Sequence, residues 1–234
     1  FKMMVNGDKI NVTENRAVLH TQTRYLVKEN VMVDGLDVSA EVRQINDRIH
    51  QFTNDIHNSS ISSSNGKSFT DAVIVGIGGS YLGCEFVYTA LKNMFQPKLK
   101  LHFLPNVDID NFGSIVKEII PDQTLWIIIS KSYTTTETMA NLEQVKRYIN
   151  HKGLSPNKHI VTVTAKGSPG DDPSNPVLDS FNMFDFIGGR YSVTSAVGGL
   201  PLSLAFGFPV FERFLNGCRL MDEHALNTPE DNNI

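Results

Sequence analysis

Cysteines and long apolar runs are scarce in this chain. Cys84 and Cys218 are the only cysteines among 234 residues, which excludes a disulfide-rich scaffold and favours a reducing compartment such as the cytoplasm. No apolar stretch is long enough to cross a bilayer, so we expect no membrane partner. The hydrophobic fraction of 41% is instead that of a globular protein with a sizeable core.

An excess of positive charge is also missing. The chain carries 21 Lys and Arg against 25 Asp and Glu, a formal net charge of -4. Nucleic acids and anionic membranes bind basic surfaces, so neither is expected as a partner. A small anionic ligand remains compatible with this charge, because a few local lysines and backbone dipoles are enough to bind one.

Common catalytic signatures are absent as well. The sequence contains no HExxH, GxSxG or GxxxxGK[ST] pattern. The seven histidines are scattered along the chain, and we interpret each as a surface or second-layer residue. The sequence therefore predicts no metal site.

Alternating strand and helix patterns begin at Asp71. Short apolar runs, typical of strands buried on both faces, occur at 72–78, 101–107, 125–130 and 159–165, with a weaker run at 182–187. Helical patterns follow at 81–94, 109–119 and 135–150, and another starts near 191. Repeated βα units predict an α/β fold with a mostly parallel sheet and helices on both faces. The pattern does not give the order of the strands.

The same pattern divides the chain into three parts. Residues 1–68 are predicted to form a mainly helical amino-terminal segment, which ends in a serine-rich linker. Residues 69–207 hold the α/β domain. Residues 208–234 contain an amphipathic helix that leads towards a further domain.

The predicted strand-to-helix junction VGIGGSYLG (75–83) is rich in glycine. In open α/β sheets, ligands bind beyond the carboxyl ends of the strands. Gly79 allows the backbone to approach a ligand closely, and Ser80 lies at a helix start, where free N–H groups attract anions. A nicotinamide dinucleotide site is an alternative, weakened because Tyr81 stands where its fingerprint needs glycine. Tight packing of strand on helix is a further alternative.

A second junction, SKSYTTTETMAN (130–141), crowds hydroxyls and one lysine between a strand and a helix. Hydroxyls, backbone N–H groups and an ammonium group all bind phosphate oxygens. Thr134 and Glu137 have the spacing of a capping box, and we interpret Glu137 as a cap. One cap uses one hydroxyl, so capping leaves most of the run unexplained. The candidate phosphate-binding residues here are Ser130, Lys131, Ser132, Tyr133, Thr134 and Thr135, with Thr138 in support.

A third junction, FIGGRYSVTSAVGG (186–199), places Arg190 directly after two glycines. An arginine beside Gly189 at the edge of a sheet could aim its guanidinium at a developing oxyanion. The alternative is a surface arginine paired with an acidic neighbour such as Asp185.

These segments resemble the glucose-6-phosphate isomerase family, also called phosphoglucose isomerase. DFIGGRYSVTSAVG (185–198) is similar to a family signature almost position for position, and the first two junctions resemble two further motifs. NGDKINVTENRAVLH (6–20) resembles the family's amino-terminal region. The resemblance implies a sugar isomerase domain, a three-layer α/β/α sandwich with a mostly parallel sheet. It also implies that the hydroxyl-rich loop binds the substrate phosphate together with Gly79 and Ser80. It further implies that Arg190, beside Gly189, stabilises an enediolate.

The implied reaction interconverts glucose 6-phosphate and fructose 6-phosphate, in glycolysis and gluconeogenesis, without metal or organic cofactor. The resemblance also implies a homodimer located in the cytoplasm. The family's base glutamate and ring-opening histidine belong to later motifs, which do not follow Arg190 here. We therefore expect an amino-terminal fragment without the second sugar isomerase domain, inactive alone. A non-catalytic phosphosugar-binding regulatory module is the alternative. The Gly-Arg pair argues against it, because binding alone does not require that arginine.

Overall fold

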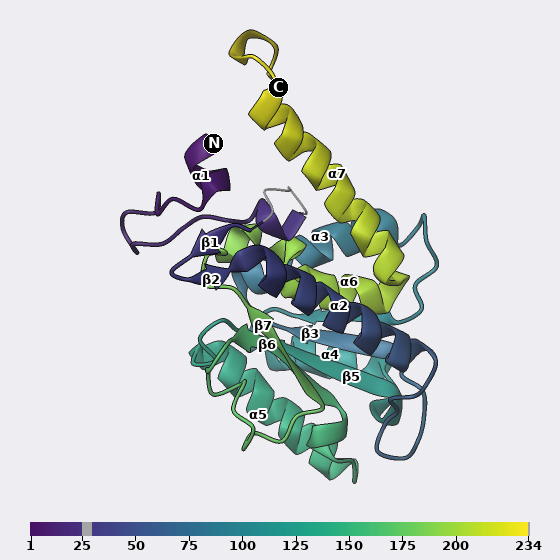
Figure 1. Ribbon diagram of the computed structural model, residues 1–234. Coiled ribbons are helices and arrows are strands. Elements are labelled where there is room, and N and C mark those ends of the chain that lie inside the picture. The colour runs from purple at the N-terminus through teal and green to yellow at the C-terminus, as the bar shows by residue number, and fades with distance from the viewer. Residues whose placement is uncertain (25–29, 234) are drawn as a thin grey trace.

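A five-stranded parallel sheet forms the centre of the protein. The computed structural model describes residues 1–24 and 30–233 (Figure 1). The strands lie in the order β4-β3-β5-β6-β7, and each neighbouring pair is parallel. Their bounds are β3 Asp71–Val75, β4 Lys100–Leu104, β5 Thr124–Ile129, β6 Ile160–Ala165 and β7 Asp179–Met183. The predicted α/β class with a parallel sheet is confirmed.

Helices cover both faces of this sheet (Figure 1). Successive side chains of a strand point to opposite faces, and in β5 Leu125 and Ile127 join a different apolar cluster from Trp126 and Ile128. The first cluster includes α2, α3 and α6, and the second includes α4 and α5. The sheet therefore lies between two layers of helices, which gives the predicted three-layer arrangement. The helices are α1 Lys2–Asn6, α2 Val38–His57, α3 Leu82–Leu91, α4 Ile109–Glu118, α5 Thr136–His151, α6 Ala196–Phe206 and α7 Phe208–Asn227.

The amino-terminal segment is less helical than predicted. The described residues between α1 and α2 form a short 3-10 helix, Gln22–Arg24, and a hairpin of β1 (Met32–Val33) and β2 (Leu36–Asp37). The expected helix is confined to α2, where Asp37 accepts a hydrogen bond from the Ala40 N–H at the N-cap. The apolar spacing thus located α2 correctly and overestimated how far the helix extends towards the amino terminus.

The last strand lies earlier than predicted. β7 spans Asp179–Met183, whereas the apolar run suggested 182–187. Phe184 and Phe186 stack with ring centroids 4.9 Å apart, and Ile187 is buried. The apolar character of 184–187 therefore belongs to a packed loop, and the strand itself is partly polar because it lies at the edge of the sheet.

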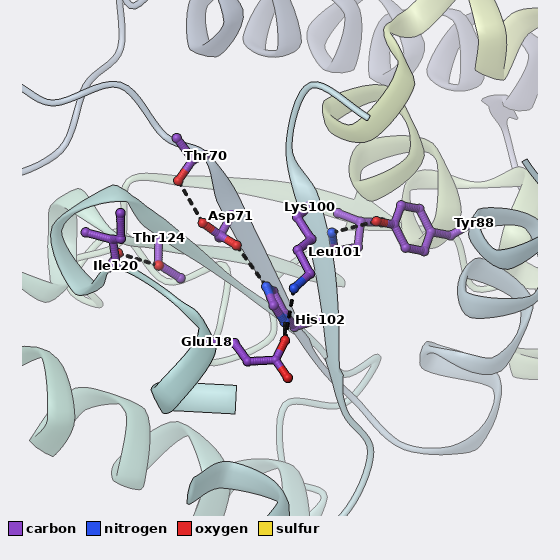
Figure 2. Close-up of polar contacts among 9 residues, drawn as sticks. All are labelled: Thr70, Asp71, Tyr88, Lys100, Leu101, His102, Glu118, Ile120 and Thr124. Atoms are coloured by element: carbon purple, nitrogen blue, oxygen red, sulfur yellow. Dashed lines mark hydrogen bonds and ion pairs between the residues drawn. The ribbon is translucent and has the colours of Figure 1, made fainter. Parts of the chain in front are cut away.

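A polar cluster links Asp71, at the amino end of β3, to His102 in the middle of β4 (Figure 2). The His102 ring lies 2.8 Å from the Asp71 carboxylate, and the Thr70 hydroxyl donates to the same carboxylate at 2.7 Å. Burial by itself would raise the pKa of Asp71, but these hydrogen bonds outweigh it and hold the pKa below its usual range. We interpret the cluster as a clamp between two strands.

Candidate functional site

The first and third junctions touch at Gly79. A Cβ atom at this position would collide with the carbonyl group of Gly189 and would lie 2.7 Å from the Arg190 nitrogen. The Ser192 hydroxyl lies 3.1 Å from the Gly79 oxygen and 2.7 Å from the Gly189 oxygen, and so links the two loops. Only glycine permits this backbone contact, which fixes the Gly-Arg turn against the end of β3.

The second junction opens into a depression of about 510 Å³. It lies where the carboxyl ends of β3, β5 and β6 meet, the place where parallel sheets bind ligands. Six of the predicted phosphate and supporting residues line it: Ser80, Ser130, Lys131, Ser132, Thr135 and Thr138. The remaining lining residues are Arg16, Ile77, Ile129, Ala165 and Asp185. We call this the hydroxyl depression.

Two predicted phosphate residues of the second junction do not line this depression. Tyr133 is buried, with a left-handed φ of 54°, and its N–H donates to the Ser130 hydroxyl at 3.1 Å. Its ring packs so closely on Gly170 that a Cβ there would lie 2.6 Å from the Tyr133 Cε2. Thr134 is exposed, and its hydroxyl donates to the Ser132 oxygen at 2.8 Å. Both residues therefore form contacts inside the loop and do not face the depression.

The capping box predicted for the second junction is wrong. Helix α5 starts at Thr136, so the N-cap is Thr135, one residue later than Thr134, and no side chain caps it. Glu137 is exposed within the first turn and does not have the N3 position that a capping box requires. No side chain therefore caps the first N–H groups of α5, and such groups favour an anion.

Two cationic side chains form ion pairs with one carboxylate beside the depression. The Arg16 Nη1 lies 3.1 Å from the Asp185 Oδ1, and the Lys131 Nζ lies 3.2 Å from the same oxygen. The lysine also donates to the backbone oxygens of Asp185 at 2.9 Å and Ile187 at 3.4 Å. Lys131 thus holds the third loop as well as lining the depression. Sequence reasoning missed Arg16, although the early segment that carries it belongs to the resemblance.

Arg190 borders a second depression of about 640 Å³, which we call the arginine depression. Lys131, Arg16 and Asp185 line both depressions, so the two adjoin. Arg190 is exposed and lies 5.3 Å from the centre of the Tyr191 ring. Within residues 1–24 and 30–233 it forms no ion pair, so the alternative of an Arg190–Asp185 pair does not hold.

A neutral histidine also packs on Tyr191. His20 stacks on Tyr191 with ring centroids 5.0 Å apart. Burial, together with the nearby charge of Arg24, lowers the pKa of His20 to about 4. The histidine therefore carries no charge near neutral pH.

Comparison with known proteins identifies the family of this chain. The sequence pattern of phosphoglucose isomerase matches residues 1–234. The chain belongs to the phosphoglucose isomerase family. It is 51% identical to the glucose-6-phosphate isomerase of Desulfosudis oleivorans, covering 100% of this chain and 44% of that protein. It is 42% identical to that of Treponema denticola, covering 97% and 43%.

A solved phosphoglucose isomerase structure has the same fold. The crystal structure of a glucose-6-phosphate isomerase from Chlamydia trachomatis superimposes with a TM-score of 0.87 at 35% identity, covering 97% of this chain and 43% of that one. The chain therefore spans less than half the length of the family members it matches. All three junctions lie within the matched part.

In the described ranges, no helix is both long and apolar enough to cross a membrane. Among the same residues, no three His, Cys, Asp or Glu side chains gather closely enough to hold a metal ion.

Proposed function

We propose that the whole protein containing this chain interconverts glucose 6-phosphate and fructose 6-phosphate through an enediolate intermediate. The observation that carries this proposal is the hydroxyl depression, where five hydroxyl side chains, a lysine and the uncapped amino end of α5 converge in a member of the isomerase family. A phosphate dianion accepts hydrogen bonds from all three kinds of group.

In this proposal the phosphate is bound by Ser80, Ser130, Lys131, Ser132 and Thr135, with Thr138 in support. Gly79 and Gly189 supply the backbone contact that positions Arg190. The guanidinium of Arg190 would face the oxygens of the enediolate, where negative charge develops, and a fixed cation there lowers the barrier. The chemistry needs no metal and no organic cofactor.

The proton-transferring base is proposed to come from outside these residues. The only carboxylates that line the two depressions are Glu14 and Asp185, within the described part of the chain. Arg16 lies 3.1 Å from Asp185 and 3.9 Å from Glu14, and Lys131 also pairs with Asp185. Both carboxylates are thus already paired with cations, which supports a base elsewhere in the whole protein.

The organisation of the whole protein follows from the same proposal. Residues 69–207 would be the first sugar isomerase domain, residues 1–68 an amino-terminal segment, and residues 208–234 a helix leading to a second domain. We propose a cytoplasmic homodimer, in line with plant relatives whose names include the word cytosolic.

The test has two parts. In a thermal-shift assay, fructose 6-phosphate should stabilise the whole protein and NAD should not, which separates the isomerase from a dehydrogenase. A coupled assay should then detect fructose 6-phosphate turnover, which separates it from a regulatory module. Stabilisation without turnover would contradict the proposed activity.

Residues 1–234 by themselves should show no appreciable isomerase activity, because the proposal assigns the base to another part of the whole protein. Their binding of fructose 6-phosphate is measured alongside, as a control for folding. Near full-length turnover from this polypeptide would contradict the assignment of the base to another part of the protein.

A further inference from the structure

Three charged side chains line the hydroxyl depression: Arg16, Lys131 and Asp185. Two cations against one carboxylate leave one net positive charge. The other nearby carboxylate, that of Glu14, lines the arginine depression instead and lies 3.9 Å from Arg16. The net charge of the side chains around a phosphate in the hydroxyl depression would therefore depend on Arg16.

The carboxylate stands beside the lysine that is proposed to hold the phosphate. Arg16 and Lys131 lie 3.1 Å and 3.2 Å from the same oxygen, Asp185 Oδ1. If Lys131 alone neutralised Asp185, the pair would offer a dianion no net charge. A second cation on Asp185 removes this conflict, because it neutralises the carboxylate from the other side.

The position of Arg16 is fixed by a closed loop. Its backbone exchanges two hydrogen bonds with Asn11, each 3.1 Å long. The Asn11 amide donates to Glu14 at 2.8 Å, which ties the loop across its middle. Further along, the Leu19 N–H donates to the Phe186 oxygen at 3.3 Å, so this segment runs beside the third junction. The backbone of Arg16 is thus fixed beside the third junction, and from there its guanidinium reaches Asp185.

We propose that Arg16 is a positioning residue for phosphate binding: it neutralises Asp185 and so leaves the charge of Lys131 to the phosphate. The inference rests on the proposed function, because it needs a phosphate in the hydroxyl depression. It assigns Arg16 no contact with the reacting atoms. It predicts that net charge, rather than the identity of the side chain at position 16, governs affinity.

The experiment is a charge cycle on the whole protein at low salt. The variants are Arg16→Gln, Asp185→Asn, the double variant and Arg16→Lys, with Arg147→Gln as control. The control removes the same kind of charge from an exposed position in α5 outside both depressions. The readouts are the inhibition constant of inorganic phosphate, the KM for fructose 6-phosphate, and the melting temperature of each variant.

Loss of one charge near a bound dianion should raise both constants about 5- to 10-fold in Arg16→Gln. Adding Asp185→Asn restores the net charge and should return them to within about twofold of the starting protein. Arg16→Lys should bind phosphate nearly as well as the starting protein, and Arg147→Gln should not change binding. The defect of Arg16→Gln should shrink at high salt, since the charges are partly exposed.

Three results would overturn the inference. If Lys131→Ala weakens phosphate binding and Arg16→Gln does not, the phosphate site stands and the role of Arg16 is wrong. If Arg16→Gln binds phosphate weakly and adding Asp185→Asn does not restore binding, Arg16 supports the structure of the site and does not act through its charge. If neither Lys131→Ala nor Arg16→Gln changes binding, the phosphate site itself is wrong. Should Arg16→Gln fail to fold, poor binding by a folded Arg16→Lys would count against the inference.

Discussion

The contact between Gly79 and the Gly-Arg turn can be tested by adding one methyl group. In Gly79→Ala, the new Cβ would collide with the carbonyl of Gly189 and lie 2.7 Å from the Arg190 nitrogen. These atoms belong to the backbone, so they cannot rotate away as the tip of a flexible side chain would. The turn must move as a unit, and Arg190 must move with it.

The size of the effect follows from the kind of collision. Overpacking of this type costs about 1–3 kcal/mol of stability. A displacement of about 1 Å at a group that stabilises a transition state can cost about 100-fold in rate. If the whole protein has the proposed activity, its kcat should fall about 10- to 100-fold, with a smaller rise in KM, because Gly79 lies against the Gly-Arg turn and does not line the hydroxyl depression.

The assay compares Gly79→Ala with Gly217→Ala in the same protein. Gly217 lies in α7, and a Cβ there would meet nothing within 4 Å. The control should leave kcat unchanged and raise stability by about 0.5–1 kcal/mol, since alanine favours a helix over glycine. If Gly79→Ala keeps the kcat and stability of the starting protein, the close contact does not position Arg190.

Two further predictions concern the loop and the strand clamp. Gly170→Ala should lower stability by about 1–3 kcal/mol and raise the KM for fructose 6-phosphate, because the added Cβ would displace Tyr133, on which the hydroxyl-rich loop rests; unchanged denaturant unfolding and KM would contradict this. The lowered pKa of Asp71 means that its pairing stabilises the fold above its ordinary pKa of 3.8 and loses this effect as pH falls through the lower folded-state pKa. Asp71→Asn should therefore reduce stability near neutral pH and flatten the acid limb of a urea-unfolding series, and an equally steep limb would show that the clamp with His102 is not responsible.

Much of the fold was predictable because buried parallel strands have a simple signature. Runs such as 125–130 are apolar on both faces of the sheet, and β5 is found there as Thr124–Ile129. The strand at the edge was misplaced, because β7 is partly polar while the loop after it is packed with Phe184 and Phe186. The strand order depends on long-range crossovers, which no local pattern encodes.

The site was predictable in composition and less so in geometry. Hydroxyl-rich chemistry at a strand-to-helix junction identified Ser130, Lys131 and Thr135, all of which line the depression. The burial of Tyr133 depends on Gly170, which lies on another loop. Arg16 could not be found from its own surroundings, since its proposed role depends on an ion pair with Asp185, which is distant in the sequence.

The most direct test of the central claim is the KM for fructose 6-phosphate after the lysine and one hydroxyl are removed from the depression. In the whole protein, the Lys131→Ala, Thr135→Ala double variant should raise KM at least about 10-fold, since a charge-assisted hydrogen bond and a neutral one are lost together. Melting temperatures of both proteins control for folding. An unchanged KM in a folded double variant would show that the hydroxyl depression does not bind the substrate phosphate.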